Sequence, residues 1–287
     1  MSGDAFRQLC THVFWCNARP KVDAGFRHGD VVFCKVDEVW RLFKALRRTR
    51  KRVVLVTGEG DKPVDRDLWR HCPPHVAAWF GTNMELEGNS RVCGLPLGLG
   101  NADGRKTLSW DEIRAVPESA PERNRLLYAN FSAHSNPAVR EPLRRWLNEP
   151  AQNWITRSDH DPDGGKASYL QALRSHRFVL CPPGNGEDTH RFWETLYCGA
   201  VPVIRRSVAM NYFTGLPVVV LDDLREVTPR ALHDHPSSRM AFDDTILRLD
   251  YWRDKIMSTR ARIAGTRIVS WGEWMAGWRA EISAACR

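Results

Sequence analysis

Candidate strands and candidate helices alternate along most of this chain, and few folds other than a parallel sheet accommodate that pattern. A strand, a helix and a second strand form a unit whose two strands run parallel. The first part of the chain has one candidate helix, at 37–48, and five short apolar runs that are typical of strands, at 12–16, 31–36, 52–58, 75–81 and 91–98. These runs predict a first α/β domain.

A second series of strands and helices begins after a polar segment with two prolines, at 111–125. This composition is typical of a domain linker. We therefore predict an α/β fold of two Rossmann-like domains, 1–118 and 119–287, that face each other across a cleft. The last helix could pack back on the first domain. The second series comprises strands at 125–131, 153–156, 177–182, 200–204 and 217–221, and helices at 136–149, 166–176, 189–199, 239–258 and 270–285.

The composition is that of an ordinary globular protein, with 43% hydrophobic and 26% charged residues. No apolar run reaches the ~18 residues of a membrane span, and the N-terminal residues lack the layout of a signal peptide. We therefore expect a cytoplasmic protein. The eight cysteines form no Cys-x-x-Cys pair and are expected to be reduced thiols. Zinc binding at 10–16 or 71–75 is the alternative, but neither group has a matching second ligand pair.

The net charge is +8, and its densest basic stretch, from Arg41 to Arg52, contains no acidic residue. This stretch overlaps an amphipathic helix, in which apolar residues at helical spacing predict a buried face and basic residues another face. The basic face is either an ordinary solvated helix surface or a surface that attracts a polyanion such as a nucleic acid, an acidic glycan or a membrane. The apolar residues are Val39, Leu42, Phe43 and Leu46, and the basic ones are Arg41, Lys44 and Arg48.

The stretch 181–194, "CPPGNGEDTHRFWE", ends one predicted strand and begins a helix. Two prolines end the strand because proline cannot continue a central ladder, and Gly184 and Gly186 permit close approach of the backbone to a ligand. Asp188 is a good N-cap, with Thr189 as the neighbouring option. A helix N-terminus at the carboxyl end of a parallel strand favours a phosphate group.

The predicted helix adds charge to this place. Arg191 can donate two parallel hydrogen bonds to a diphosphate, and His190 offers another donor. Glu194 lies one turn further on and could accept hydrogen bonds from a pair of sugar hydroxyls. The stretch is therefore interpreted as a site for a nucleotide or a nucleotide sugar. The alternative is a capped helix with an Arg191–Glu194 surface pair, worth only about 0.2–0.5 kcal/mol. The spacing matches neither a P-loop nor a dinucleotide fingerprint.

Residues 177–204 resemble the signature of exostosin-like glycosyltransferases, and the weaker likenesses at 79–101 and 130–140 are similar to small bacterial and phage relatives. The resemblance implies a GT-B architecture in which the second domain holds most of the nucleotide-sugar donor, with a UDP-sugar favoured. It also implies inversion of the anomeric centre and no bound metal or other cofactor, so that the helix dipole and arginine stabilise the leaving diphosphate. The residues that match are Phe178, Leu180, Pro182, Gly184, Arg191, Glu194, Gly199, Pro202 and Val203.

By this resemblance, Arg191 would contact the diphosphate and Glu194 the ribose. Asp222 and Asp223 end another strand and are further candidates, with helix capping as the alternative. The segment 161–163 satisfies the Asp-x-Asp pattern of metal-dependent transferases, but it lies in a polar stretch that we interpret as a loop. The whole predicted donor-binding set is Asn136, Arg140, Pro183, Gly184, Asn185, Gly186, Asp188, Thr189, His190, Arg191, Glu194 and Asp222.

Inversion requires a general base that takes a proton from the attacking hydroxyl. In this architecture the base should come from the first domain, near the end of a strand. Asp61 is preferred and Glu59 is next, because both follow the clearest strand there, and Asp37 follows another. His12 and His28 are weaker candidates. The alternative for Asp61 is a turn residue.

The acceptor is open between two classes. One is a bacterial glycan or lipid-linked saccharide, and the other is a 5-hydroxymethylpyrimidine in DNA, which would require an exposed or flipped base. The basic face between Arg41 and Arg52 makes DNA a reasonable partner. An alternative from another class is a non-catalytic module that binds a nucleotide or a polyanion, since fold alone does not establish activity.

Overall fold

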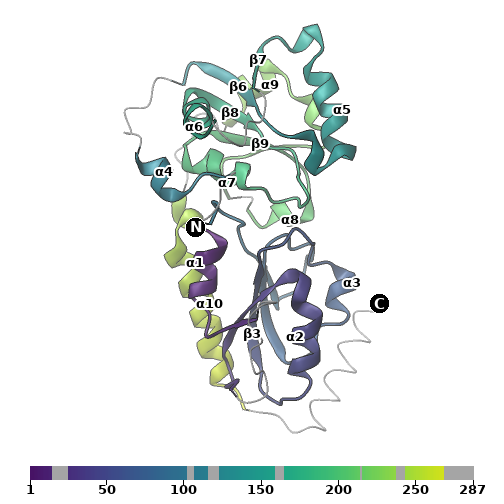
Figure 1. Cartoon of the computed structure of the whole chain (residues 1–287), viewed down its shortest axis with the longest axis vertical. Helices are drawn as coiled ribbons and strands as arrows, with labels where there is room; N and C mark the ends of the chain where they lie inside the picture. Colours follow the sequence, from purple (N-terminus) through teal and green to yellow (C-terminus); the bar gives the residue numbers. More distant parts are fainter. Residues whose placement is uncertain are drawn as a thin grey trace. The chain divides into compact units, whose positions relative to one another are not determined.

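The computed structural model describes residues 1–14, 25–101, 107–115, 123–158, 165–213, 215–236 and 243–267. The chain forms two compact units, each with its own parallel sheet (Figure 1). The N-terminal unit contains residues 4–95 together with the chain from residue 248, and the C-terminal unit contains residues 1–3 and 96–247.

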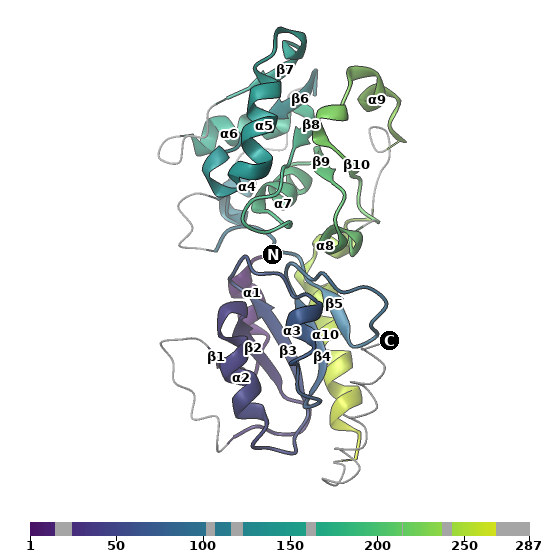
Figure 2. The same cartoon turned by 90° about the vertical axis from the view of Figure 1, so that its right-hand side faces the viewer.

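The sheet of the N-terminal unit has five parallel strands in chain order (Figure 2). Its strands are β1 (His12–Phe14), β2 (Val31–Lys35), β3 (Val53–Gly58), β4 (Val76–Gly81) and β5 (Val92–Gly94). Strands β3 and β4 are buried along their whole length, as expected for parallel strands that are covered on both faces.

The helices of this unit cover both faces of its sheet. Helix α10 (Leu249–Ala264) contacts β3 and β4, and α2 (Val39–Leu46) packs on β2. Figure 1 shows α2 and α10 on opposite sides of β3. The predicted apolar face of α2 is confirmed, because all four of its residues are buried. The remaining elements are α1 (Gly3–Gln8), η1 (Val36–Glu38) and α3 (Arg66–Trp69).

The sheet of the C-terminal unit also has five parallel strands, in the order β10-β9-β8-β6-β7 (Figure 2). Numbered along the chain this order is 2-1-3-4-5, which is the doubly wound order with a topological switch point between its first and third strands. The strands are β6 (Arg125–Ala129), β7 (Ile155–Arg157), β8 (His176–Leu180), β9 (Val201–Arg205) and β10 (Val219–Leu221). The switch point therefore lies where β6 and β8 end.

A core of apolar side chains from the strands and surrounding helices supports this sheet, including Leu127, Phe178, Leu180 and Val203. The helices of the unit are α4 (Trp110–Ala115), η2 (Ala133–Ser135), α5 (Pro137–Leu147), η3 (Pro150–Gln152), α6 (Lys166–Ser175), α7 (His190–Tyr197), α8 (Val208–Asn211), η4 (Leu224–Glu226), α9 (Pro229–Asp234) and η6 (Asp244–Leu247). Two α/β units with parallel sheets are what the sequence pattern predicts.

The chain passes between the units at 3/4, at 95/96 and at 247/248, which differs from the single boundary predicted at 118/119. The physical reason is that residues before 118 bond to the C-terminal unit. Leu108 donates its backbone N–H to Glu194, and Arg174 donates to the backbone oxygen of Ile113. Helix α4 occupies the start of the predicted linker. The predicted helix at 270–285 and the Asp-x-Asp segment at 161–163 lie outside the described residues.

No helix in the described part of the chain is long and apolar enough to cross a membrane. Six cysteines fall in that part and all six are free thiols, whereas Cys16 and Cys286 lie outside it. Across the same ranges, no cluster of three or more His, Cys, Asp or Glu side chains could hold a metal ion.

Candidate functional site

The loop that follows β8 is held in place by two residues at the start of α5. Arg140 is buried and donates from Nε to the backbone oxygen of Pro183 (2.8 Å), from Nη2 to that of Pro182 (3.1 Å) and from Nη1 to that of Ser132 (2.8 Å). Asn136 donates from Nδ2 to the backbone oxygen of Gly184 (2.9 Å). Both residues were predicted to bind a ligand, and the structure shows that both brace the loop.

Gly184 is required here by close approach. A Cβ atom at this position would lie 3.2 Å from Nη2 of Arg140, so a larger residue would displace the guanidinium from its carbonyl partners. The loop then turns back on itself, with the N–H of Gly184 donating to the backbone oxygen of Gly186 (2.9 Å). Proline and glycine in this loop therefore fix its course, and the exposed Asn185 lies at its tip.

Arg191 lies in the first turn of α7 and reaches the end of β6. Its Nη2 donates to Oδ1 of Asn130 over a long 3.4 Å, and Nδ2 of Asn130 donates to Oγ of Ser158 (2.8 Å). The Nε atom of Arg191 is buried and has no hydrogen-bond partner among the described residues. Because Ala129 pairs with Leu180 at the ends of β6 and β8, this contact lies at the switch point.

Two guanidinium groups thus come together at the switch point. Burial, and then the charge of Arg191, lowers the pKa of Arg140 to about 10. Burial also opposes the charge of Arg191, but the neighbouring Tyr169, Cys181 and Glu194 outweigh it and raise the pKa of Arg191. Both arginines therefore remain cationic at neutral pH, and Arg191 retains a donor that no described residue fills. This arrangement suits an anion.

Glu194 is buried, with an exposed fraction of only 3%. Its Oε1 accepts the backbone N–H of Leu108 (2.7 Å), and its Oε2 accepts the hydroxyl of Tyr169 in α6 (2.8 Å). The alternative of a solvated Arg191–Glu194 surface pair is therefore wrong. A carboxylate has about four acceptor positions, so Glu194 can accept further hydrogen bonds. Sequence patterns gave no sign of Tyr169 or Leu108, because both are distant in the chain.

Asp188 is not the N-cap of α7, since that position is occupied by Thr189, whose side chain makes no capping bond. The carboxylate of Asp188 accepts from the N–H of Leu97 and from Nε1 of Trp193, both at 2.7 Å. Burial raises its pKa to about 7 despite these donors. His190 also points to this segment, and its Nδ1 donates to the backbone oxygen of Gly98 (2.7 Å). Asp188 and His190 therefore anchor residues 97–98 to α7.

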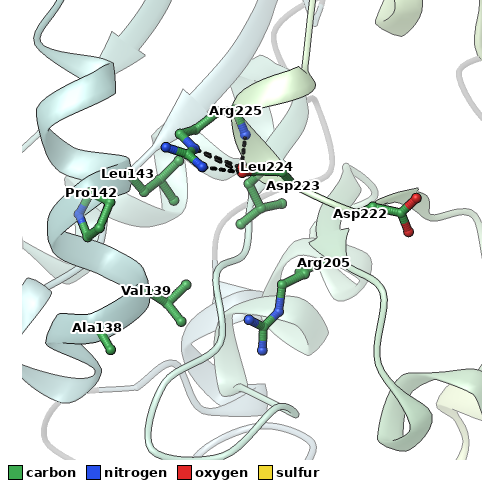
Figure 3. Close-up of a pocket in the computed structure, with 9 residues that line it drawn as sticks. All are labelled: Ala138, Val139, Pro142, Leu143, Arg205, Asp222, Asp223, Leu224 and Arg225. Carbon is green, nitrogen blue, oxygen red and sulfur yellow. Dashed lines mark hydrogen bonds and ion pairs between the residues drawn. The ribbon is translucent and has the colours of Figure 1, made fainter.

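A cavity of about 240 Å³ opens at the carboxyl ends of β9 and β10 (Figure 3). Arg205 ends β9 and donates to Oε1 of Glu187 (2.5 Å), while its own Nε is buried without a hydrogen-bond partner in the described ranges. Asp222 pairs with Nε of Arg206 (2.7 Å). The lining residues are Ala138, Val139, Pro142, Leu143, Arg205, Asp222, Asp223, Leu224 and Arg225.

The neighbouring Asp223 has the capping role that was the alternative for it. Its Oδ1 accepts the backbone N–H of Arg225 (2.9 Å) at the start of η4. The guanidinium of Arg225 bonds to the same carboxylate (Figure 3), and these hydrogen bonds lower the pKa of Asp223. Asp223 therefore shapes one wall of the cavity.

The candidate bases lie at the carboxyl edge of the N-terminal sheet. Asp37 follows β2 and forms ion pairs with Lys62 (3.1 Å) and Lys35 (3.7 Å). A Cβ atom at Gly60 would lie 2.9 Å from Oδ2 of Asp37, so the loop carrying Glu59 and Asp61 packs beside that carboxylate. The structure brings these three residues to one place, and their catalytic role stays a prediction.

The two weaker histidine candidates lie at the amino edge of the same sheet. His12 begins β1, and its Nε2 lies 2.7 Å from Oδ2 of Asp30, the residue before β2. His28 accepts the backbone N–H of Arg52 at Nδ1 (3.2 Å). Both positions are at the opposite ends of the strands from Asp37, so the histidines do not join the carboxylates.

Comparison with models of known protein families finds a match that covers this site. Residues 102–227 match the model of the Exostosin GT47 domain, and this range includes the switch point, the loop after β8 and α7. No curated protein matches the sequence of the chain.

Two solved structures are similar over most of the chain. One is an alpha,alpha-trehalose-phosphate synthase (UDP-forming) from Burkholderia xenovorans, with 11% identity, a TM-score of 0.40, and coverage of 90% of this chain and 75% of that chain. The other is an alpha,alpha-trehalose-phosphate synthase (UDP-forming) from Burkholderia vietnamiensis, with 10% identity, a TM-score of 0.40, and coverage of 91% and 76%. The match over 102–227, together with the signature residues within it, identifies an Exostosin GT47 domain in this part of the chain and supports a glycosyltransferase of the exostosin-like family.

Proposed function

We propose that the chain transfers a sugar from a nucleotide-sugar donor, with a UDP-sugar favoured, to an acceptor hydroxyl. The donor diphosphate would bind at the β6–β8 switch point. The observation that carries this proposal is the buried Nε of Arg191, which lacks a hydrogen-bond partner among the described residues and lies beside a second cation, Arg140. A diphosphate would fill that donor and offset the repulsion between the two guanidinium groups.

The chemistry of the leaving group supports the same place. Negative charge builds up on the diphosphate as the bond to the sugar breaks, and a group that binds this charge more strongly in the transition state accelerates the reaction. Arg191 and the N-terminus of α7 would supply this stabilisation, so we propose a reaction that needs no metal. Glu194 would accept a hydrogen bond from a ribose hydroxyl with a lone pair that Leu108 and Tyr169 leave free.

We further propose that the cavity beside Arg205 and Asp222 receives the nucleoside end of the donor. Its volume of about 240 Å³ is below the ~300–1,000 Å³ of pockets that enclose a whole drug-sized ligand. It would therefore hold one end of the donor while the diphosphate lies at Arg191. Apolar side chains of α5 on one wall and polar groups on the other suit a flat heterocycle with hydrogen-bonding edges.

On the acceptor side, we propose inversion by a single displacement. A carboxylate of the N-terminal unit would take the proton of the attacking hydroxyl while the diphosphate leaves from the other face of the sugar. Asp61 is the preferred base, followed by Glu59 and Asp37. Replacing each by its amide, and measuring sugar transfer separately from donor binding, would identify the base as the residue whose change lowers kcat without weakening the donor.

The test of the donor site is a panel of nucleotide sugars with released nucleotide as the readout. Arg191→Ala should lower kcat/KM by about 10- to 150-fold, since a hydrogen bond to a charged group contributes about 1.5–3 kcal/mol. Arg145→Ala is the matched control, because Arg145 is an exposed arginine of α5 in the same unit. If Arg191→Ala kept both donor binding and turnover, the site would be wrongly assigned. Donor binding with no release or transfer would instead support a binding module.

A further inference from the structure

The outer surface of helix α2 carries a row of exposed side chains that take no part in the hydrophobic core. Trp40, Lys44 and Arg47 occur at i, i+4 and i+7, so they lie in one row along the helix, and all three are exposed. The indole of Trp40 is 51% exposed. Its ring packs against that of His71 at an interplanar angle of 62°, with ring centroids 4.8 Å apart. We call Trp40, Lys44 and Arg47 the aromatic–basic stripe.

The stripe is strongly cationic. Arg41 and Arg48 flank it on the outer surface of α2 and are also exposed. Glu38 is the only acidic residue between 38 and 52, and it pairs with Arg41 (3.0 Å). Within the part of the chain that the structure describes, no carboxylate pairs with Lys44 or Arg47. Two unpaired cations beside an exposed tryptophan complement a ligand that has both negative charge and a flat ring.

We propose that the aromatic–basic stripe binds a single-stranded nucleic acid, with one base stacked on Trp40 and the phosphates beside Lys44 and Arg47. Stacking on an aromatic side chain next to a cationic groove is how proteins hold single strands without regard to sequence. Trp40 and Arg47 are seven residues apart, a rise of about 10 Å along the helix axis, so a strand whose nucleobase stacks on Trp40 can pass both Lys44 and Arg47.

The position of Trp40 in the fold places the stripe near the candidate general bases. Trp40 lies in the first turn of α2, three residues after Asp37, at the carboxyl edge of the N-terminal sheet. A nucleobase stacked on Trp40 would be close to the loop that carries Glu59 and Asp61, two of the candidate general bases. The inference rests on the proposed function, because it names the acceptor as a base in a nucleic acid strand. An acidic glycan is the competing ligand, and it forms one arm of the test.

Binding of the full-length protein to a fluorescein-labelled 12-nucleotide oligo(dT) by anisotropy tests the proposal. With Lys44 and Arg47 in contact, affinity should fall by about 7-fold between 50 and 200 mM KCl, from a slope of about −0.7 per phosphate contact. Trp40→Ala should weaken binding by about 5- to 150-fold, the effect of one stacked base. Lys44→Ala/Arg47→Ala should reduce the salt slope by about 1.4.

Two matched controls separate the stripe from general effects. Trp110 has a similar exposed fraction, 47%, but lies next to Asp111 and Glu112 in the other unit, so Trp110→Ala should bind the oligonucleotide normally. Arg260→Ala/Arg262→Ala removes the same charge from exposed positions of α10, on the other side of the sheet from α2 (Figure 1). This variant should keep the salt slope of the parent protein.

Four results would overturn the proposal. One is equal loss of binding in the α2 and α10 double variants, and another is unchanged binding by Trp40→Ala. The third is tighter binding of a labelled heparin oligosaccharide than of oligo(dT), with Trp40→Ala weakening both alike. Equal affinity for a blunt 12-base-pair duplex would also count against a stacked base. No donor is present in these measurements, so their failure would leave the donor site as proposed.

Discussion

The hydrogen bond between Tyr169 and Glu194 allows a sharp test of how the candidate site is built. The phenol donates to Oε2 of a carboxylate that is almost completely buried, over 2.8 Å. Burial, and then the charge of Glu194, raises the pKa of Tyr169 well above its usual value, so the phenol keeps its proton. Tyr169→Phe removes only the hydroxyl and leaves the ring in place.

The expected loss follows from what remains after the substitution. Oε2 of Glu194 would lose its donor inside the protein, and a hydrogen bond to a charged group contributes about 1.5–3 kcal/mol. For a unit of this size, 1 kcal/mol corresponds to about 2–4 °C in Tm. We therefore expect Tyr169→Phe to lower the Tm of the C-terminal unit by roughly 3–12 °C. A freed carboxylate would also be less well oriented towards the donor, so kcat/KM should fall at temperatures far below Tm.

Calorimetry of a double-mutant cycle with Glu194→Gln isolates the pair. If the bond acts as described, the two changes together should cost less than the sum of the single changes, by at least about 1 kcal/mol. Tyr251→Phe is the control, because Tyr251 is a partly exposed tyrosine of α10. A coupling near zero, with Tyr169→Phe as stable and as active as the parent, would refute the view that Tyr169 positions Glu194.

Two further substitutions test the surroundings of α7 by urea unfolding. The pKa of Asp188 is raised from 3.8 to about 7 in the folded protein, so between these pH values the native carboxyl holds a proton that the unfolded chain has lost. The contribution of Asp188 to stability therefore falls as pH rises from about 4 to 7, and Asp188→Asn should remove up to about 4 kcal/mol of that pH dependence. Parallel plots of unfolding free energy against pH for the two proteins would contradict this. Gly199 ends α7 with φ of +74°, so Gly199→Ala should cost about 1–2 kcal/mol, and a change below about 0.5 kcal/mol would show that the backbone adapts.

The sequence predicts the fold well wherever the signal is local. The continuous apolar runs of β2 and β3 indicate parallel strands that are buried on both faces, and the spacing of Val39 to Leu46 identifies the buried face of α2. Each of these patterns depends on neighbours within two helical turns. The boundary between the units is set instead by contacts far apart in the chain, such as Leu97 with Asp188, and no local pattern reports those contacts.

The same limit explains which parts of the site were predictable. Proline, glycine and a helix start mark the loop after β8 from sequence alone, because they act on their own backbone. What the charged residues do depends on distant partners. Asp188 matches an N-cap by type and position, yet Trp193 and Leu97 occupy its carboxylate. Asn130, Ser158 and Tyr169 complete the surroundings of Arg191 and Glu194, and none of them stands in a recognisable pattern.

Arg140 and Arg191 look alike in sequence as donor residues, and the structure separates them by what they already bind. Arg140 donates hydrogen bonds to three backbone oxygens, so these contacts hold its guanidinium group in place. Among the described residues, nothing accepts from the buried Nε of Arg191, and the charge of Arg191 lowers the pKa of Arg140. This repulsion is a free-energy cost of the empty site. An anion bound at Arg191 would remove part of that cost, so it would gain affinity from the rigid Arg140 without touching it, and Arg140 should become more basic when a diphosphate binds.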